Sequence, residues 1–122
     1  MELTMRVAVL FCFAIAPGFA RSWSGALVDS SCYDSLERNS NPFETSPGAR
    51  GRDQQIRYCS PKTKTKTFAV VLEDWTRLKL NSSGNSKAAE LVRKTGKKSP
   101  FLVVVTGEVS GETVKVDSIS LR

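Results

Sequence analysis

The sequence predicts a mainly β domain, built as a small five-stranded barrel with one short helix. Two observations carry this prediction. β-branched and aromatic residues gather in short runs bounded by Gly, Pro, Asn and Asp, and one segment shows a sustained helical spacing of apolar residues. The length of 122 residues suits a single domain.

The C-terminal stretch predicts a β-hairpin. Phe101 to Thr106 is a run of apolar and β-branched residues, which pack well on a pleated surface. Pro100 suits the first position of a strand, and Gly107 marks a bend or bulge. Ser110-Gly111 supplies the positive φ that a tight hairpin turn needs.

The returning strand changes its parity. Val114 and Val116 share one face, whereas Ile119 and Leu121 fall on the other face of a regular strand. All four can point into the core only if the strand contains one extra residue, so we expect a β-bulge near Asp117-Ser118.

Three strands and one helix precede this hairpin. The strands are predicted at Trp23–Asp29, Phe68–Glu73 and Thr76–Leu80, with a turn at Asp74-Trp75. The helix is expected to begin at a cap on Asn85 or Ser86 and to run to about Thr95, with Gly96 ending it. Its apolar stripe consists of Ala88, Leu91, Val92 and Thr95.

Residues 30 to 66 predict a long loop between the first two strands, because no apolar period is sustained there. A disulfide between Cys32 and Cys59 is expected to hold the loop, and Asp53 to cap one short helix carrying Ile56. The chain contains no histidine, and two thiols alone do not make a zinc site. We therefore expect no metal and no cofactor.

The predicted order is strand, long loop, strand, strand, helix, strand, strand. This is the connectivity of the OB-fold, a Greek-key barrel with a helix between strands 3 and 4. A plain five-stranded α+β sandwich is the competing architecture.

Several motifs resemble those of a group of small exported bacterial proteins with an OB-like fold, whose biochemical function is not established. They are G-x-L-x-D-S-x-C (Gly25 to Cys32), FAVVLED followed by LKL, GN-x-KAAEL (Gly84 to Leu91) and VTG-x-V-x-G-x-T-x-K-V-D-S-I (Val105 to Ile119). The resemblance implies the fold and export, and it carries over no catalytic residue. This chain departs from the pattern at Trp75, where glycine is expected in an Asp-Gly turn, and has fewer cysteines in the long loop.

Residues 1–20 have the layout of a cleaved signal peptide, and residues 21–122 form the barrel domain. Arg6 precedes an apolar run from Val7 to Ala16, and small residues at Gly18 and Ala20 place the cleavage after Ala20. A membrane anchor is the alternative, but a run this short spans only about half of a bilayer core. We expect a periplasmic or secreted protein with no integral membrane segment after cleavage.

The formal net charge of +6 could attract an anionic ligand. In OB-folds ligands lie across strands 2 and 3 near the loops that join strands 1–2 and 4–5, so cations and an aromatic ring there predict a binding face. Its residues are Arg50, Arg52, Arg57, Lys62, Lys64, Lys66, Trp75, Arg77 and Lys79. The alternatives are a solvated basic surface and a Trp75 that packs in the core or at the barrel rim.

A second basic cluster follows the predicted helix, where cations stabilise the helix dipole without any ligand. It consists of Arg93, Lys94, Lys97 and Lys98.

The functional prediction is a non-enzymatic, exported binding module for an anionic ligand or envelope component. The alternative is a structural or protein-interaction domain of the cell envelope, and nucleic acid is an improbable partner for an exported protein. A hydrolase using two of Asp29, Asp34 and Glu37 is a distant third, because the absence of histidine excludes the usual triads. Asn81-Ser82-Ser83 is a glycosylation sequon that matters only in a eukaryotic source.

Overall fold

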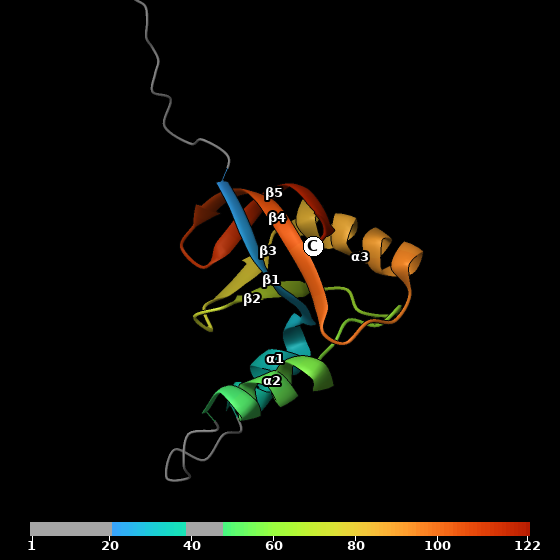
Figure 1. Cartoon of the computed structure of the whole chain (residues 1–122). Helices are drawn as coiled ribbons and strands as arrows, with labels where there is room; N and C mark the ends of the chain where they lie inside the picture. Colours follow the sequence, from blue (N-terminus) through green and yellow to red (C-terminus); the bar gives the residue numbers. More distant parts are fainter. Residues whose placement is uncertain (1–20, 39–47) are drawn as a thin grey trace, which may run out of the picture.

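The computed structural model describes residues 21–38 and 48–122 (Figure 1). The predicted signal peptide and residues 39–47 of the predicted long loop lie outside these residues. The described part contains five strands and three helices. They are β1 (Arg21–Asp29), α1 (Ser30–Arg38), α2 (Gly48–Tyr58), β2 (Phe68–Leu72), β3 (Arg77–Leu80), α3 (Ser82–Thr95), β4 (Phe101–Ser110) and β5 (Thr113–Leu121).

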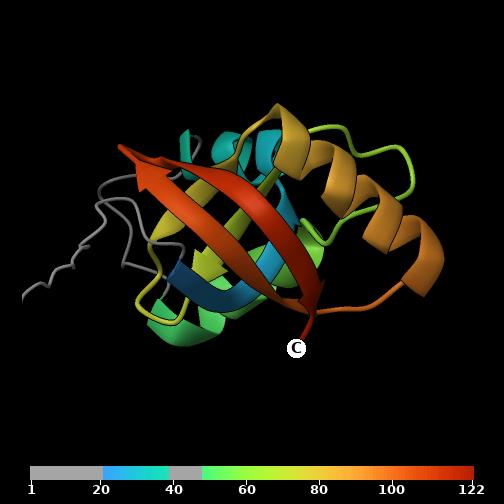
Figure 2. The ribbon, with the colours of Figure 1, turned by 90° about the horizontal axis from the view of Figure 1, so that it is seen from above.

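The five strands form a closed barrel in the order β1-β2-β3-β5-β4, with β4 pairing back onto β1. All neighbouring strands are antiparallel except β3 and β5, which run parallel over a short stretch. The prediction of a mainly β chain with five strands is therefore confirmed. Figure 2 shows the long β4–β5 hairpin crossing the front of the barrel.

The hairpin follows the sequence prediction closely. Gly111 occupies the turn with φ of 64°. Thr106 pairs with Ser118 and Gly107 with Val116, so Asp117 is the extra residue of the predicted bulge. The expectation that Leu121 points into the core is wrong: its side chain is 41% exposed because β5 ends there.

Two apolar clusters stabilise the fold, one on each face of β1 and β2. The first fills the barrel interior and includes Leu27, Phe68, Val70 and Phe101. α3 closes this interior with Ala88 and Val92, two residues of its predicted apolar stripe.

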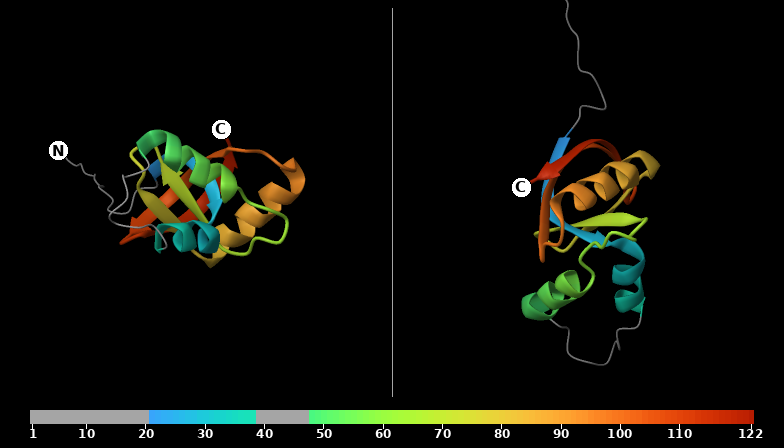
Figure 3. Two further views of the ribbon diagram at one scale, coloured as in Figure 1. Left: turned by 90° about the horizontal axis from the view of Figure 1, so that it is seen from below. Right: turned by 90° about the vertical axis from the view of Figure 1, so that its right-hand side faces the viewer.

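The second cluster lies outside the barrel, under α1 and α2. It consists of Ala26, Val28, Tyr33, Ile56, Cys59, Ala69 and Val71, with Cys32, Leu36 and Trp75 packed against it. In Figures 1 and 3 these two helices lie below the barrel, whereas α3 packs against its side. Because both faces of β2 are covered, the run FAVVL is apolar throughout instead of alternating.

The connection between the first two strands was predicted as a long loop with one short helix, and this is wrong, because it contains both α1 and α2. The Asp29 side chain caps α1 by accepting a 3.1 Å hydrogen bond from the Cys32 N–H. α2 begins at Gly48, well before the expected cap at Asp53. The predicted disulfide is confirmed: Cys32 in α1 is bonded to Cys59, directly after α2, with a Cα–Cα distance of 5.5 Å.

α3 begins one turn earlier than predicted. Its N-cap is Asn81, whose side-chain oxygen accepts a 2.9 Å hydrogen bond from the Gly84 N–H. Asn85, one of the two expected caps, instead accepts a 2.9 Å bond from the Phe68 N–H of β2. Gly96 ends the helix with a positive φ of 84°, as expected.

Candidate functional site

The residues of the predicted basic face lie at three separate places, and the structure does not bring them together. Arg77 and Lys79 on β3 face α1. Arg52 and Arg57 of α2 lie beside Trp75 of the β2–β3 turn, and Arg57 also reaches the third place. The three predicted lysines of the 59–67 segment follow α2. Arg50 belongs to α2, but its side chain lies outside the described part.

At the first place the cations are already paired with carboxylates of α1. The Arg77 Nη1 atom contacts Asp34 and lies 2.6 Å from a Glu37 carboxylate oxygen. The Lys79 ammonium lies 3.6 Å from Asp34. Because these charges are neutralised by the chain itself, this part of β3 offers little attraction to an anion.

These ion pairs also involve Asp34 and Glu37, two of the three carboxylates that were considered for a hydrolase. Asp34 and Glu37 converge on one guanidinium nitrogen of Arg77. Asp29 uses one oxygen to cap α1 and the other to accept a 3.0 Å bond from the Thr65 hydroxyl. All three carboxylates therefore have contacts that serve the fold.

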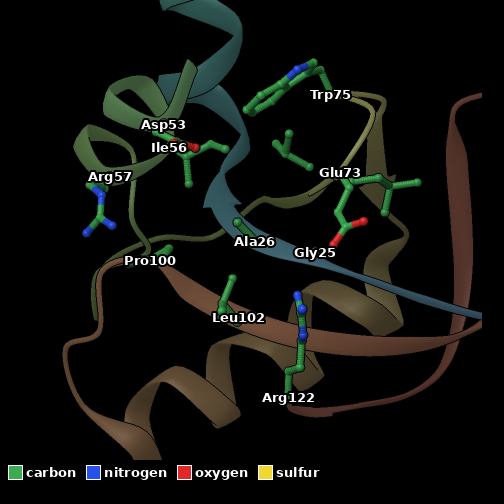
Figure 4. A pocket seen from close by; sticks show the side chains of 12 residues that line it. Gly25, Ala26, Asp53, Ile56, Arg57, Glu73, Trp75, Pro100, Leu102 and Arg122 are labelled. Carbon is green, nitrogen blue, oxygen red and sulfur yellow. The ribbon is translucent and has the colours of Figure 1, made fainter. Parts of the chain in front are cut away.

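At the second place Trp75 forms one wall of a groove of about 180 Å³, the Trp75 groove (Figure 4). Its ring packs against the outer apolar cluster, and the Arg52 guanidinium lies 5.5 Å from its centroid. Trp75 is thus neither an exposed platform nor a core residue: it is partly buried at the edge of α2. The groove is lined by Gly25, Ala26, Asp53, Ile56, Arg57, Val71, Leu72, Glu73, Trp75, Pro100, Leu102 and Arg122.

The turn that presents this ring is unusual, because Trp75 has a positive φ of 71°. The Trp75 N–H donates to the Leu72 carbonyl at 2.9 Å, and the Asp74 carboxylate accepts a 3.0 Å bond from the Thr76 N–H. This second bond holds the pKa of the Asp74 carboxyl below its ordinary value. The departure from the Asp-Gly pattern is thus accommodated by a left-handed tryptophan.

At the third place a basic surface forms between the segment after α2 and the C-terminal end of α3. Two adjoining cavities, of about 400 Å³ and about 270 Å³, share Pro61, Lys62 and Lys97. We call this surface the lysine cleft, defined by Arg57, Tyr58, Lys62, Lys64, Arg93, Lys97 and Lys98. Lys66 is exposed but lines neither cavity.

Hydrogen bonds fix the two walls of the lysine cleft. The Thr65 hydroxyl, held by Asp29, accepts a 3.0 Å bond from the Lys62 N–H. Arg57 donates to the Ser99 carbonyl at 2.8 Å, which joins the end of α2 to the segment before β4. The backbone that carries the lysines is therefore positioned by the fold on both sides.

The charged side chains that line the lysine cleft are all positive. Within the described chain, the lining residues of its two cavities include six cations and no carboxylate. Arg93, Lys97 and Lys98 lie near the C-terminus of α3, where they complement the helix dipole. The dipole does not explain Lys62 and Lys64, which reach the same place from a different segment.

Sequence reasoning treated the two halves of the lysine cleft separately and missed Tyr58, which is 72% exposed beside the cations. The available signal was the pair of basic runs at residues 62–66 and 93–98. The two basic runs meet because the disulfide and the Arg57–Ser99 hydrogen bond join segments that are distant in the sequence.

Comparison with family models, with curated proteins and with solved structures finds no match for this chain. Among the described residues, no helix has the length and apolar character needed to cross a membrane. The same residues contain no cluster of three or more potential metal-ligating Cys, Asp or Glu side chains.

Proposed function

We propose that this chain is an exported, non-enzymatic OB-like module that binds an anionic group in the lysine cleft. The fold part of the proposal is supported by the strand order β1-β2-β3-β5-β4, the parallel contact of β3 with β5 and the position of α3 between β3 and β4. The disulfide supports maturation in an oxidising compartment.

The observation that carries the ligand class is the convergence of cations from two segments onto cavities without a lining carboxylate. Like charges held together repel, and an oxyanion placed among them relieves this repulsion. Tyr58 adds an exposed aromatic ring, which can stack on a sugar or another planar group. An acidic envelope component carrying phosphate, sulfate or carboxylate groups fits this surface.

The outer face of β3, where a ligand was first expected, fits this role less well. Arg77 and Lys79 are paired with α1, and the outer face of β2 is covered by apolar contacts with the two helices. The lysine cleft lies where the C-terminal ends of α2 and α3 meet, outside these apolar contacts. We therefore propose it as the binding surface in place of the strand 2–3 face.

The test compares two double variants with equal loss of charge. Lys97→Ser with Lys98→Ser changes the cleft, whereas Lys87→Ser with Lys115→Ser removes two exposed lysines that line neither cavity. Each lysine near an anionic surface contributes about 1 kcal/mol, so the cleft variant should bind roughly 30-fold more weakly than the parent. The control should lose much less.

Binding is measured on two probes, a sulfated polysaccharide matrix and vesicles rich in phosphatidylglycerol, across a salt series. A selective loss on one probe identifies the source of the anionic group. Equal behaviour of the two variants on both probes would contradict a specific cleft and would favour the structural or protein-interaction alternative.

A further inference from the structure

We propose that the Trp75 groove is a second binding site, and that it takes a zwitterion of the size of a single amino acid. This site adjoins the lysine cleft, with which it shares Arg57, but its argument does not depend on that cleft. Three features of the groove carry it: the backbone of Trp75, the charges on the rim, and the size of the hollow.

The backbone of Trp75 is the first feature. A bulky residue with φ of 71° is rare, because the left-handed region costs L-residues roughly 1–3 kcal/mol and costs glycine almost nothing. Glycine would close the same turn without strain. What tryptophan adds is a ring fixed at the mouth of the groove, with the Arg52 guanidinium 5.5 Å from its centroid. Strain of this kind gathers at binding sites, where the position of one side chain matters more than local stability.

The rim charges are the second feature. Asp53 and Arg57 come from α2, Glu73 from the start of the β2–β3 turn, and Arg122 from the end of the chain. Figure 4 shows them around the hollow, with Asp53 and Arg57 on one side and Glu73 and Arg122 on the other. Each side thus carries one carboxylate and one guanidinium, of which the Arg57 guanidinium also donates to the Ser99 carbonyl at 2.8 Å. No ion pair joins any of the four to another described residue.

The size of the hollow is the third feature. Its volume of about 180 Å³ equals roughly six water molecules in liquid water. A groove below the roughly 300–1,000 Å³ of drug-sized pockets favours a ligand of the order of a single amino acid. The floor is apolar, formed by Ala26, Ile56 and Leu102. A small amino acid matches the groove in three ways. Its ammonium can lie at one carboxylate of the rim, its carboxylate at one guanidinium, and its apolar side chain on the floor.

The ligand class differs from that of the lysine cleft, whose lining carries positive charge only. A simple anion would meet two carboxylates at the Trp75 groove, and a simple cation would meet two guanidinium groups. Among charged ligands, one that carries both signs avoids this repulsion, and unlike a neutral ligand it also gains ion pairs. An α-amino acid, either free or at the end of a short peptide, has the required charges.

The test uses the indole N–H signals of the full domain in proton–nitrogen NMR spectra. The sequence contains two tryptophans, so two such signals are expected, and Trp75→Gly assigns them. L-alanine and L-leucine should move the Trp75 signal saturably, with a Kd of about 1–10 mM, as expected for so few atoms. Acetate, ethylammonium and the uncharged N-acetylalanine methylamide should move it at least 5-fold less at equal concentration.

Exposed rim charges provide variants that leave the core intact. Glu73→Gln with Arg122→Gln should weaken alanine binding at least 5-fold, whereas Glu108→Gln with Lys115→Gln, also exposed and remote from the groove, should not. Three results would each overturn the proposal: no saturable shift below about 50 mM alanine, an acetate response as strong as that of alanine, or equal binding by the two double variants. The Lys97→Ser, Lys98→Ser protein should bind alanine normally, which separates this test from that of the lysine cleft.

Discussion

The side chain of Asn81 fastens α3 to the barrel, and its removal should have a large effect on stability. Its oxygen accepts hydrogen bonds from the Gly84 N–H at 2.9 Å and from the Val116 N–H of β5 at 3.2 Å. The first bond caps the helix, and the second joins the helix start to a strand. Asn81→Ala removes this one acceptor and therefore both hydrogen bonds at once.

The two contributions can be estimated separately. Loss of an N-cap costs about 1 kcal/mol. Val116 is buried, and leaving its N–H without a partner costs about 1–3 kcal/mol more. The free energy of unfolding should therefore fall by about 2–4 kcal/mol, which lowers the Tm by roughly 10–25 °C for a domain of this size.

Urea and thermal unfolding, followed by far-UV circular dichroism, measure this loss. Asn81→Asp is the matched control, because a carboxylate oxygen can accept both bonds and is also favoured at a helix N-terminus. Its stability should stay within about 1 kcal/mol of the parent. A free energy of unfolding for Asn81→Ala within about 0.5 kcal/mol of the parent would refute the reasoning, because it would mean that water replaces both bonds without cost.

Two further predictions concern the helices under the barrel. Replacing Cys32 and Cys59 together by serine releases a loop with a sequence separation of 27 residues, and the free energy of unfolding in urea should fall by about 3.6 kcal/mol. A fall of less than about 1 kcal/mol would mean that the outer cluster alone holds α1 and α2. Burial raises the pKa of the Tyr33 hydroxyl above its ordinary value of 10.0, and the Glu37 carboxylate raises it further. The unfolded chain therefore releases this proton first, so stability should be unaffected below about pH 10 and should decline as the pH rises through the folded pKa. Tyr33→Phe should flatten that decline in urea titrations at alkaline pH, and an unchanged slope would contradict the assignment.

The strands were predictable because their signals are local. The hairpin from Phe101 to Leu121 carries β-branched residues, a turn glycine and a parity change, and each of these acts within a few residues. The bulge at Asp117 follows from the parity alone. The strand pairing agrees with this, because Thr106 pairs with Ser118 and Gly107 pairs with Val116, which leaves Asp117 unpaired as the extra residue.

Of the helices after β1, α1 was not predicted and α2 was predicted only as a short helix from Asp53, because their signals are weak without the sheet. α1 has the sequence SSCYDSLER, whose Ser and Asp residues favour turns when considered alone. The missed clue was Asp29, which caps the Cys32 N–H and precedes Tyr33 and Leu36 on the apolar face of the helix. Helices this short are stable only when packed, and that packing is not written in their own residues.

The candidate sites show the same division. The sequence supplied the cations and Trp75, but not their partners. Arg77 is paired with Asp34 and Glu37, which are far away in the chain, so it is not available to a ligand. Lys62 and Lys97 become neighbours through contacts between loops. Net charge therefore motivates the proposal of an anionic ligand, whereas the place where that charge gathers depends on tertiary structure.

The outer apolar cluster has a consequence for the maturation of the chain. β2 is the run FAVVL, and its outward residues Ala69 and Val71 are covered only after α1 and α2 have docked. A barrel that closes while both thiols are still free presents this face to other copies, and short uncharged β-forming runs of this kind self-associate. The Cys32–Cys59 disulfide, which joins α1 to the end of α2, should therefore favour coverage of this face, and expression under reducing conditions should yield more aggregated material than expression under oxidising conditions.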